Sequence, residues 1–122
     1  MSKRPSKYKA QPTVIDGIRF HSKAEARRYQ ELKLLERAGE IIDLRIQPSY
    51  DLCAWQNGNA PVVGVYRADF SYFDVRHRKG VVEDVKSPPT RTSLYRWKIK
   101  HLRMQYGIEV AEVYASTSNH PR

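Results

Sequence analysis

Two short apolar segments carry acidic and basic side chains at a spacing that suits phosphate chemistry. In the second segment Asp84 and Lys86 are two residues apart, so on a β-strand their side chains share one face and Glu83 points to the other. Asp69 lies in the preceding valine-rich and aromatic segment, where Arg67 and Ser71 would share its face. Two neighbouring strands joined by a short turn would bring Asp69 beside Asp84 and Lys86.

This combination of groups predicts metal-dependent hydrolysis. Two adjacent carboxylates repel each other, and one is driven towards protonation unless a cation lies between them. An oxygen-only site without His or Cys suits a hard cation such as Mg²⁺ or Mn²⁺, which activates water and neutralises charge on a phosphodiester. Lys86 would orient or help to deprotonate the attacking water and would contact the phosphate. The alternative is an exposed Asp84–Lys86 ion pair, since Asp-x-Lys occurs by chance in many proteins.

A third carboxylate, Glu25, has two interpretations. Ser22 and Glu25 have the spacing of a capping box, so Glu25 could simply complete the N-terminus of a helix. Tyr29 and Leu32 follow at helical spacing, which places Glu25 on the stripe expected to pack inward. A carboxylate at that boundary needs a partner, and a metal cluster would supply one. We expect Glu25 to serve in both ways.

The order of expected elements predicts an α/β fold. A helix is expected over residues 22–38 and a second over 92–106, each followed by glycine, and a hairpin over 14–20. Strands are expected over 41–52 (bent near Pro48), 62–75, 81–86 and 108–114. From the first helix the order is α-β-β-β-α-β, which predicts a mixed central sheet flanked by helices.

These residues also resemble a known nuclease pattern. Glu25 on a first helix, the segment 66–70 (Tyr-Arg-Ala-Asp-Phe) and the segment 81–87 (Val-Val-Glu-Asp-Val-Lys-Ser) resemble the PD-(D/E)XK nucleases. The likeness is closest to archaeal Holliday-junction resolvases and phage junction-cleaving endonucleases. Segment 17–25, followed by Arg28-Tyr29, also resembles a group of uncharacterised phage-encoded proteins placed near these nucleases. The resemblance covers roughly residues 14–114.

The resemblance implies a restriction-endonuclease-like core and a role for each site residue. Asp69 and Asp84 would bind the metal with Glu25 assisting, the peptide carbonyl of Val85 would be a further ligand, and Lys86 would serve water and phosphate. Ala68 stands where the family pattern has proline. The resemblance further implies cleavage of branched DNA in phage recombination or processing, by a homodimer whose two active sites make symmetric cuts.

The charge of the chain points to the same partner. Lys and Arg number 22 against 13 Asp and Glu, the formal net charge is +9, and such a surface attracts a polyanion. Residues 1–13 are expected to form a flexible basic arm, and residues 86–103 contain no acid. An ordinary basic helix face is the alternative for the second segment. The residues expected to contact DNA are Lys3, Arg4, Lys7, Lys9, Arg91, Tyr95, Arg96, Lys98 and Lys100.

Size and composition restrict the remaining possibilities. The 122 residues suffice for one domain, expected over 14–122, and 40% are apolar, which supports one modest core. No apolar run suits a membrane span or a signal peptide, and Cys53 has no partner cysteine for a disulfide. We therefore expect a cytoplasmic protein, in a phage-infected host if the resemblance holds. Two hypotheses remain: a Mg²⁺-dependent DNA endonuclease and a non-catalytic DNA-binding module on the same fold.

Overall fold

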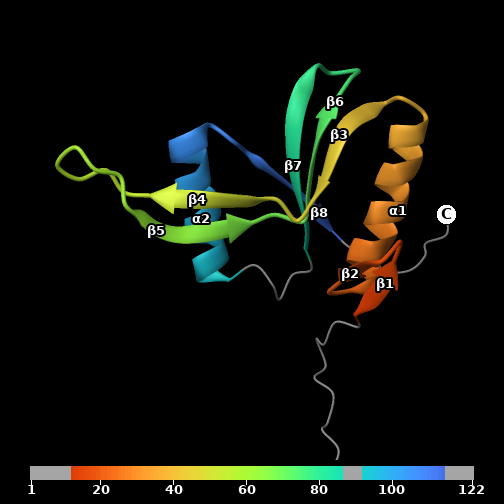
Figure 1. Cartoon of the computed structure of the whole chain (residues 1–122), viewed down its shortest axis with the longest axis horizontal. Helices are drawn as coiled ribbons and strands as arrows, with labels where there is room; N and C mark the ends of the chain where they lie inside the picture. The colour runs from red at the N-terminus through yellow and green to blue at the C-terminus, as the bar shows by residue number, and fades with distance from the viewer. Residues whose placement is uncertain (1–11, 87–91, 115–122) are drawn as a thin grey trace, which may run out of the picture.

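A mixed four-stranded sheet forms the centre of the molecule (Figure 1). The computed structural model describes residues 12–86 and 92–114. The strand order is β3-β6-β7-β8, in which β3–β6 and β6–β7 are antiparallel and β7–β8 are parallel. The expected mixed sheet in an α/β chain is therefore confirmed. The strands are β3 (Ile41–Ile46), β6 (Phe70–Asp74), β7 (Lys79–Lys86) and β8 (Val110–Tyr114).

Both helices form where their capping residues predict them. Helix α1 (Lys23–Arg37) begins after Ser22, whose side chain accepts a hydrogen bond from the backbone N–H of Glu25. Helix α2 (Ser93–Tyr106) begins after Thr92 in the same way and ends at Gly107, whose φ is +73°. No helix in the described parts of the chain is long and apolar enough to cross a membrane.

The two long strands expected from the sequence are each divided in two. β4 (Ser49–Cys53) and β5 (Val62–Arg67) leave the central sheet and pair with each other as an antiparallel ribbon. Five strands, and not three, therefore lie between the helices. The expected bend near Pro48 is confirmed, and the expectation of one continuous strand over 62–75 is wrong.

The break between β5 and β6 is caused by the break between β3 and β4. Pro48 has no N–H to donate to a ladder, and Gln47 before it has a φ of +55°, so the chain turns out of the central sheet there. Since β3 pairs with β6 and β4 pairs with β5, the chain between β5 and β6 must turn beside Pro48. Accordingly, the N–H of Ala68 donates to the carbonyl of Pro48 at 3.0 Å, and the N–H of Gln47 donates to that of Asp69 at 2.8 Å.

The two faces of the sheet have separate cores. Helix α1 and the hairpin of β1 (Thr13–Ile15) and β2 (Ile18–Phe20) cover one face, and α2 packs between the ribbon and the other. The first core contains Phe20, Ala26, Tyr29, Leu32, Ile41 and Phe70. The second contains Leu52, Tyr66, Ala68, Val82, Tyr95 and Leu102. Strand β7 lies between them, so its alternate side chains enter different environments.

Candidate active site

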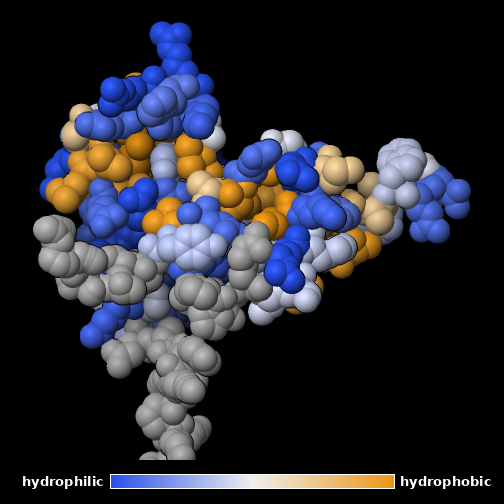
Figure 2. All heavy atoms as spheres, turned by 180° about the vertical axis from the view of Figure 1, so that it is seen from behind, coloured by the Kyte–Doolittle hydropathy of each residue, from blue (hydrophilic) through white to orange (hydrophobic). Residues whose placement is uncertain are grey.

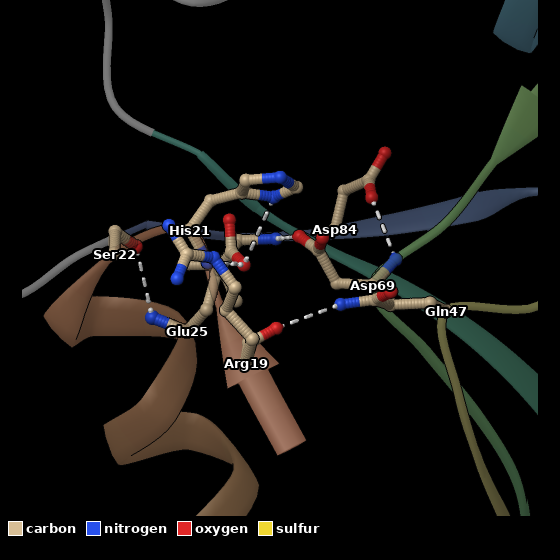
Figure 3. A network of polar contacts seen from close by, with 8 residues as sticks. Arg19, His21, Ser22, Glu25, Gln47, Asp69 and Asp84 are labelled. Atoms are coloured by element: carbon tan, nitrogen blue, oxygen red, sulfur yellow. Dashed lines mark hydrogen bonds and ion pairs between the residues drawn. The ribbon is translucent and has the colours of Figure 1, made fainter. Parts of the chain in front are cut away.

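Asp69 lies at the junction between β5 and β6, and its neighbour across the sheet is Asp84 of β7 (Figure 3). The N–H of Asp69 donates to Oδ1 of Asp84 at 3.1 Å, and the N–H of Val85 donates to Oδ2 of Asp69 at 2.7 Å. Asp69 lies between two strands, so the expected strand alternation with Arg67 and Ser71 does not apply to it. Because the pairing between β6 and β7 stops here, the N–H of Val85 donates to the side chain of Asp69 and not to a backbone carbonyl.

Glu25 and Lys86 line the same cleft, which has a volume of about 420 Å³. Glu25 comes from the first turn of α1, and its Oε1 accepts a hydrogen bond from the N–H of His21 at 3.2 Å (Figure 3). Lys86 is at the end of β7, and its Nζ lies 3.7 Å from the centre of the Tyr95 ring. Residues from α1, the β5–β6 junction and β7 therefore meet at one place, and Glu25 both caps its helix and faces the cleft.

The three acids share an environment that disfavours their charged forms. Burial, and after it the charge of Glu25, raise the pKa of Asp69 to about 6, against hydrogen bonding from Val85. Burial also raises the pKa of Asp84 to about 6, with the charge of Asp69 adding to it and the Tyr66 hydroxyl opposing. Burial raises the pKa of Glu25 as well. In the described structure, neither aspartate has a basic side chain within ion-pairing distance.

The neighbouring acid on the opposite face of β7 has a complete set of partners. Glu83 is 2% exposed, and its two carboxylate oxygens accept from Nε and Nη2 of Arg28 at 2.9 and 2.7 Å. The hydroxyl of Tyr72 donates to the same carboxylate. Because Arg28 is on α1, one turn after Glu25, this bidentate pair fixes the helix that carries Glu25 against the strand that carries Asp84.

The donor atoms of the cleft fit a hard cation. No three His, Cys, Asp or Glu side chains among the described residues are already placed to coordinate one ion. Asp69 and Asp84 are close enough for the charge of Asp69 to raise the pKa of Asp84, and a cation between them would offset that repulsion. The carboxylates of Glu25, Asp69 and Asp84 offer oxygens, the ligands that Mg²⁺ and Mn²⁺ prefer.

One comparison with known proteins assigns a family. A family model described as "Protein of unknown function (DUF1064)" matches residues 5–118. The chain belongs to the DUF1064 family. The match spans every residue that lines the cleft. No curated protein and no solved structure matches the chain.

The residues expected to contact DNA do not all lie in the cleft of this DUF1064 chain. Lys98 lines the cleft, whereas Arg96 and Lys100 border a separate groove beside Arg103. Tyr95 also lines the cleft, but it is 8% exposed and its hydroxyl donates to Glu112 at 2.8 Å, so it packs in the second core and its contact with DNA stays a prediction. The remaining five lie outside the described residues: Lys3, Arg4, Lys7, Lys9 and Arg91.

The DUF1064 cleft also contains two residues for which the sequence suggested no role. The buried hydroxyl of Tyr66 donates to Oδ2 of Asp84, and Arg67 lines the cleft. Both precede Asp69 in one valine-rich segment, where a tyrosine followed by an arginine was the available signal. Strand periodicity counted from Asp69 placed Arg67 on the same face but did not reach Tyr66, and β5 and β6 belong to different sheets.

Proposed function

We propose that this DUF1064 protein is a Mg²⁺- or Mn²⁺-dependent endodeoxyribonuclease with a restriction-endonuclease-like core of the PD-(D/E)XK type. One observation carries the proposal: Glu25, Asp69, Asp84 and Lys86 come from three separate elements and line one cleft. The raised pKa values of the two aspartates support it, because they indicate negative charge for which the described residues supply no paired cation.

Asp69 and Asp84 would hold the ion, with Glu25 assisting. The backbone of Val85 supports a fourth oxygen ligand: the N–H and C=O of a strand residue point to the same edge, and this N–H points to Asp69. When bound, the ion would lower the pKa of a water molecule and neutralise charge on the scissile phosphate. The Lys86 ammonium would orient that water and contact a phosphate oxygen. Its contact with the Tyr95 ring fixes its position.

The proposed substrate is DNA, and specifically branched DNA in phage recombination or processing. The net charge of +9 favours a polyanion, and Lys98 and Arg67 add positive charge to the cleft wall. Symmetric cleavage of a junction would require two active sites, so we propose a homodimer that acts in the cytoplasm of the infected host.

A non-catalytic DNA-binding module is the second candidate, since a basic surface on this fold fits it equally. The acids in the cleft favour the nuclease. Three carboxyl groups would repel the phosphates of a bound strand unless a cation lay between them and the DNA. A module that only binds DNA gains nothing from keeping Glu25, Asp69 and Asp84 together.

The direct test is cleavage of labelled duplex, single-stranded and four-way-junction DNA, with Mg²⁺ and with EDTA. Asp84→Asn should lower the Mg²⁺-dependent rate by at least about 100-fold, since it removes one ion ligand. The matched control is Asp43→Asn, the same change at an exposed acid in β3, which should cleave like the wild type. DNA binding without cleavage of any substrate would favour the binding module, and full activity in Asp84→Asn would refute the site.

A further inference from the structure

The β4–β5 ribbon projects from the rest of the molecule (Figures 1 and 2). At its tip the N–H of Gln56 donates to the carbonyl of Asn59 at 2.7 Å, and the reverse bond is 2.8 Å. Asn57 and Gly58 between them have φ values of +47° and +81°. These are features of a two-residue type I′ hairpin turn, which holds the tip in a defined shape.

The tip presents side chains that have no structural role in the described protein. Trp55 is 76% exposed, so its large ring is available for contact with a partner. Gln56, Asn57 and Asn59 around it are also exposed. Amide side chains pair with base edges, and an indole ring stacks on bases. The set therefore suits a nucleic acid.

The outer part of the ribbon has no acidic side chain to repel DNA, since the one acid of the ribbon, Asp51, lies opposite Val65 near its base. Between Asp51 and Asp69 the chain has no acidic residue, and its one charged side chain is Arg67. The ribbon is also continuous with the cleft, because Val65, Tyr66 and Arg67 at its base form part of the cleft wall. A duplex that enters the cleft must therefore run beside the ribbon.

We propose that the β4–β5 ribbon is a second DNA contact that enters a groove at a fixed distance from the cut. This rests on the proposed nuclease function. The extended chain from Arg67, at the end of β5, back to Asn59 at the tip spans roughly 25 Å at about 3.3 Å per residue. That length corresponds to about seven base pairs at 3.4 Å each. The major groove admits a two-stranded ribbon, in which Gln56 and Asn59 would contact base edges and Trp55 would stack or pack on them.

The test uses the Asp84→Asn protein, so that bound DNA stays intact. Trp55→Ala and the double variant Gln56→Ala/Asn59→Ala leave the Asn57-Gly58 turn in place. Each should weaken binding to a fluorescent duplex or four-way junction by roughly 5- to 100-fold, the effect expected from losing a stacked base or a base-edge contact. The control Gln30→Ala, at an exposed residue of α1, should bind as the parent does.

Hydroxyl-radical footprinting gives the second readout. The parent should protect DNA about seven base pairs from the cleft, and the tip variants should lose that protection alone. Unchanged affinity and footprint in both tip variants would overturn the ribbon contact and leave the nuclease proposal intact. No DNA binding by the wild type or the parent would overturn both. Loss of self-association with unchanged DNA affinity would assign the ribbon to a second copy of the chain and overturn the proposal.

Discussion

Glu83 and Asp84 are adjacent in β7, equally buried and of the same charge type, yet their surroundings differ. Glu83 is 2% exposed and has the guanidinium of Arg28 and the hydroxyl of Tyr72. Asp84 is 3% exposed and has the hydroxyl of Tyr66, one backbone N–H and a second carboxyl group. A buried carboxylate requires a positive partner. The fold supplies that partner on one face of the strand. On the other face no described side chain forms an ion pair with Asp84, although the charge of Lys86 nearby lowers the pKa of its carboxyl group.

The two faces of β7 therefore have different roles. The Arg28–Glu83 pair fixes α1 to β7 and so positions Glu25 over the cleft. The same rigid connection keeps Asp69, Asp84 and Glu25 together although they repel one another. An electrostatically unfavourable site of this kind is stable only where other contacts determine its geometry. We conclude that the α1 face stabilises the fold and that the other face is prepared for a cation from solution.

Arg28→Met should have the largest effect on stability. It leaves the buried Glu83 carboxylate without its cation, and breaking a buried ion pair costs about 3–5 kcal/mol. Arg27→Met, an exposed neighbour on the same helix, is the matched control and should cost under about 0.5 kcal/mol. Urea unfolding measures both. Equal losses in the two variants would remove the distinction between the faces.

The pH dependence of metal-free stability should distinguish the cleft face. The native pKa of Asp84 is raised to about 6 from 3.8, so the native state binds protons more tightly than the unfolded state. The unfavourable contribution of Asp84 is therefore absent below about pH 4, grows as the pH rises to about 6 and is complete above it. Asp84→Asn should gain stability relative to wild type over that range, by the order of 2 kcal/mol. A constant difference from pH 4 to pH 7 would contradict this account.

Matched Tyr→Phe changes on the two faces should have the smallest effects. Tyr66 donates a hydrogen bond to Asp84 and so lowers the pKa of that carboxyl group. Tyr66→Phe should therefore weaken metal affinity by about 10-fold or more, the usual effect of removing a partner of a metal ligand. Tyr72→Phe should leave metal affinity unchanged and cost about 1.5 kcal/mol, because the lost bond is to a buried charge. Calorimetric titration and urea unfolding of both variants separate the two effects. Equal loss of metal affinity would show that the faces are coupled.

Residue types and local spacing were enough to predict the helices and the acids of the cleft. Ser22 and Thr92 mark the helix starts because capping is a local interaction. The split of the expected strand over 62–75 was hidden, because its cause is Pro48 in the partner strand. Partners far apart in the chain were equally hidden. Arg28 meets Glu83, and Tyr66 meets Asp84, only after the strands have paired and α1 has packed.

The packing of α2 determines which of its basic residues expected to contact DNA face the cleft. Arg96, Lys98 and Lys100 form one basic run in the sequence, but their helical directions differ. Lys98 faces the cleft, and the other two face a separate groove. Charge predicted the kind of partner, and it could not predict which side chains of a helix would meet that partner.

Calorimetric titration of Mg²⁺ or Mn²⁺ into metal-free protein at neutral pH tests the central claim most directly. We expect saturable binding by the wild type and by Asp43→Asn, and binding at least about 10-fold weaker in Asp84→Asn. No binding by the wild type, or equal binding by Asp84→Asn, would contradict it.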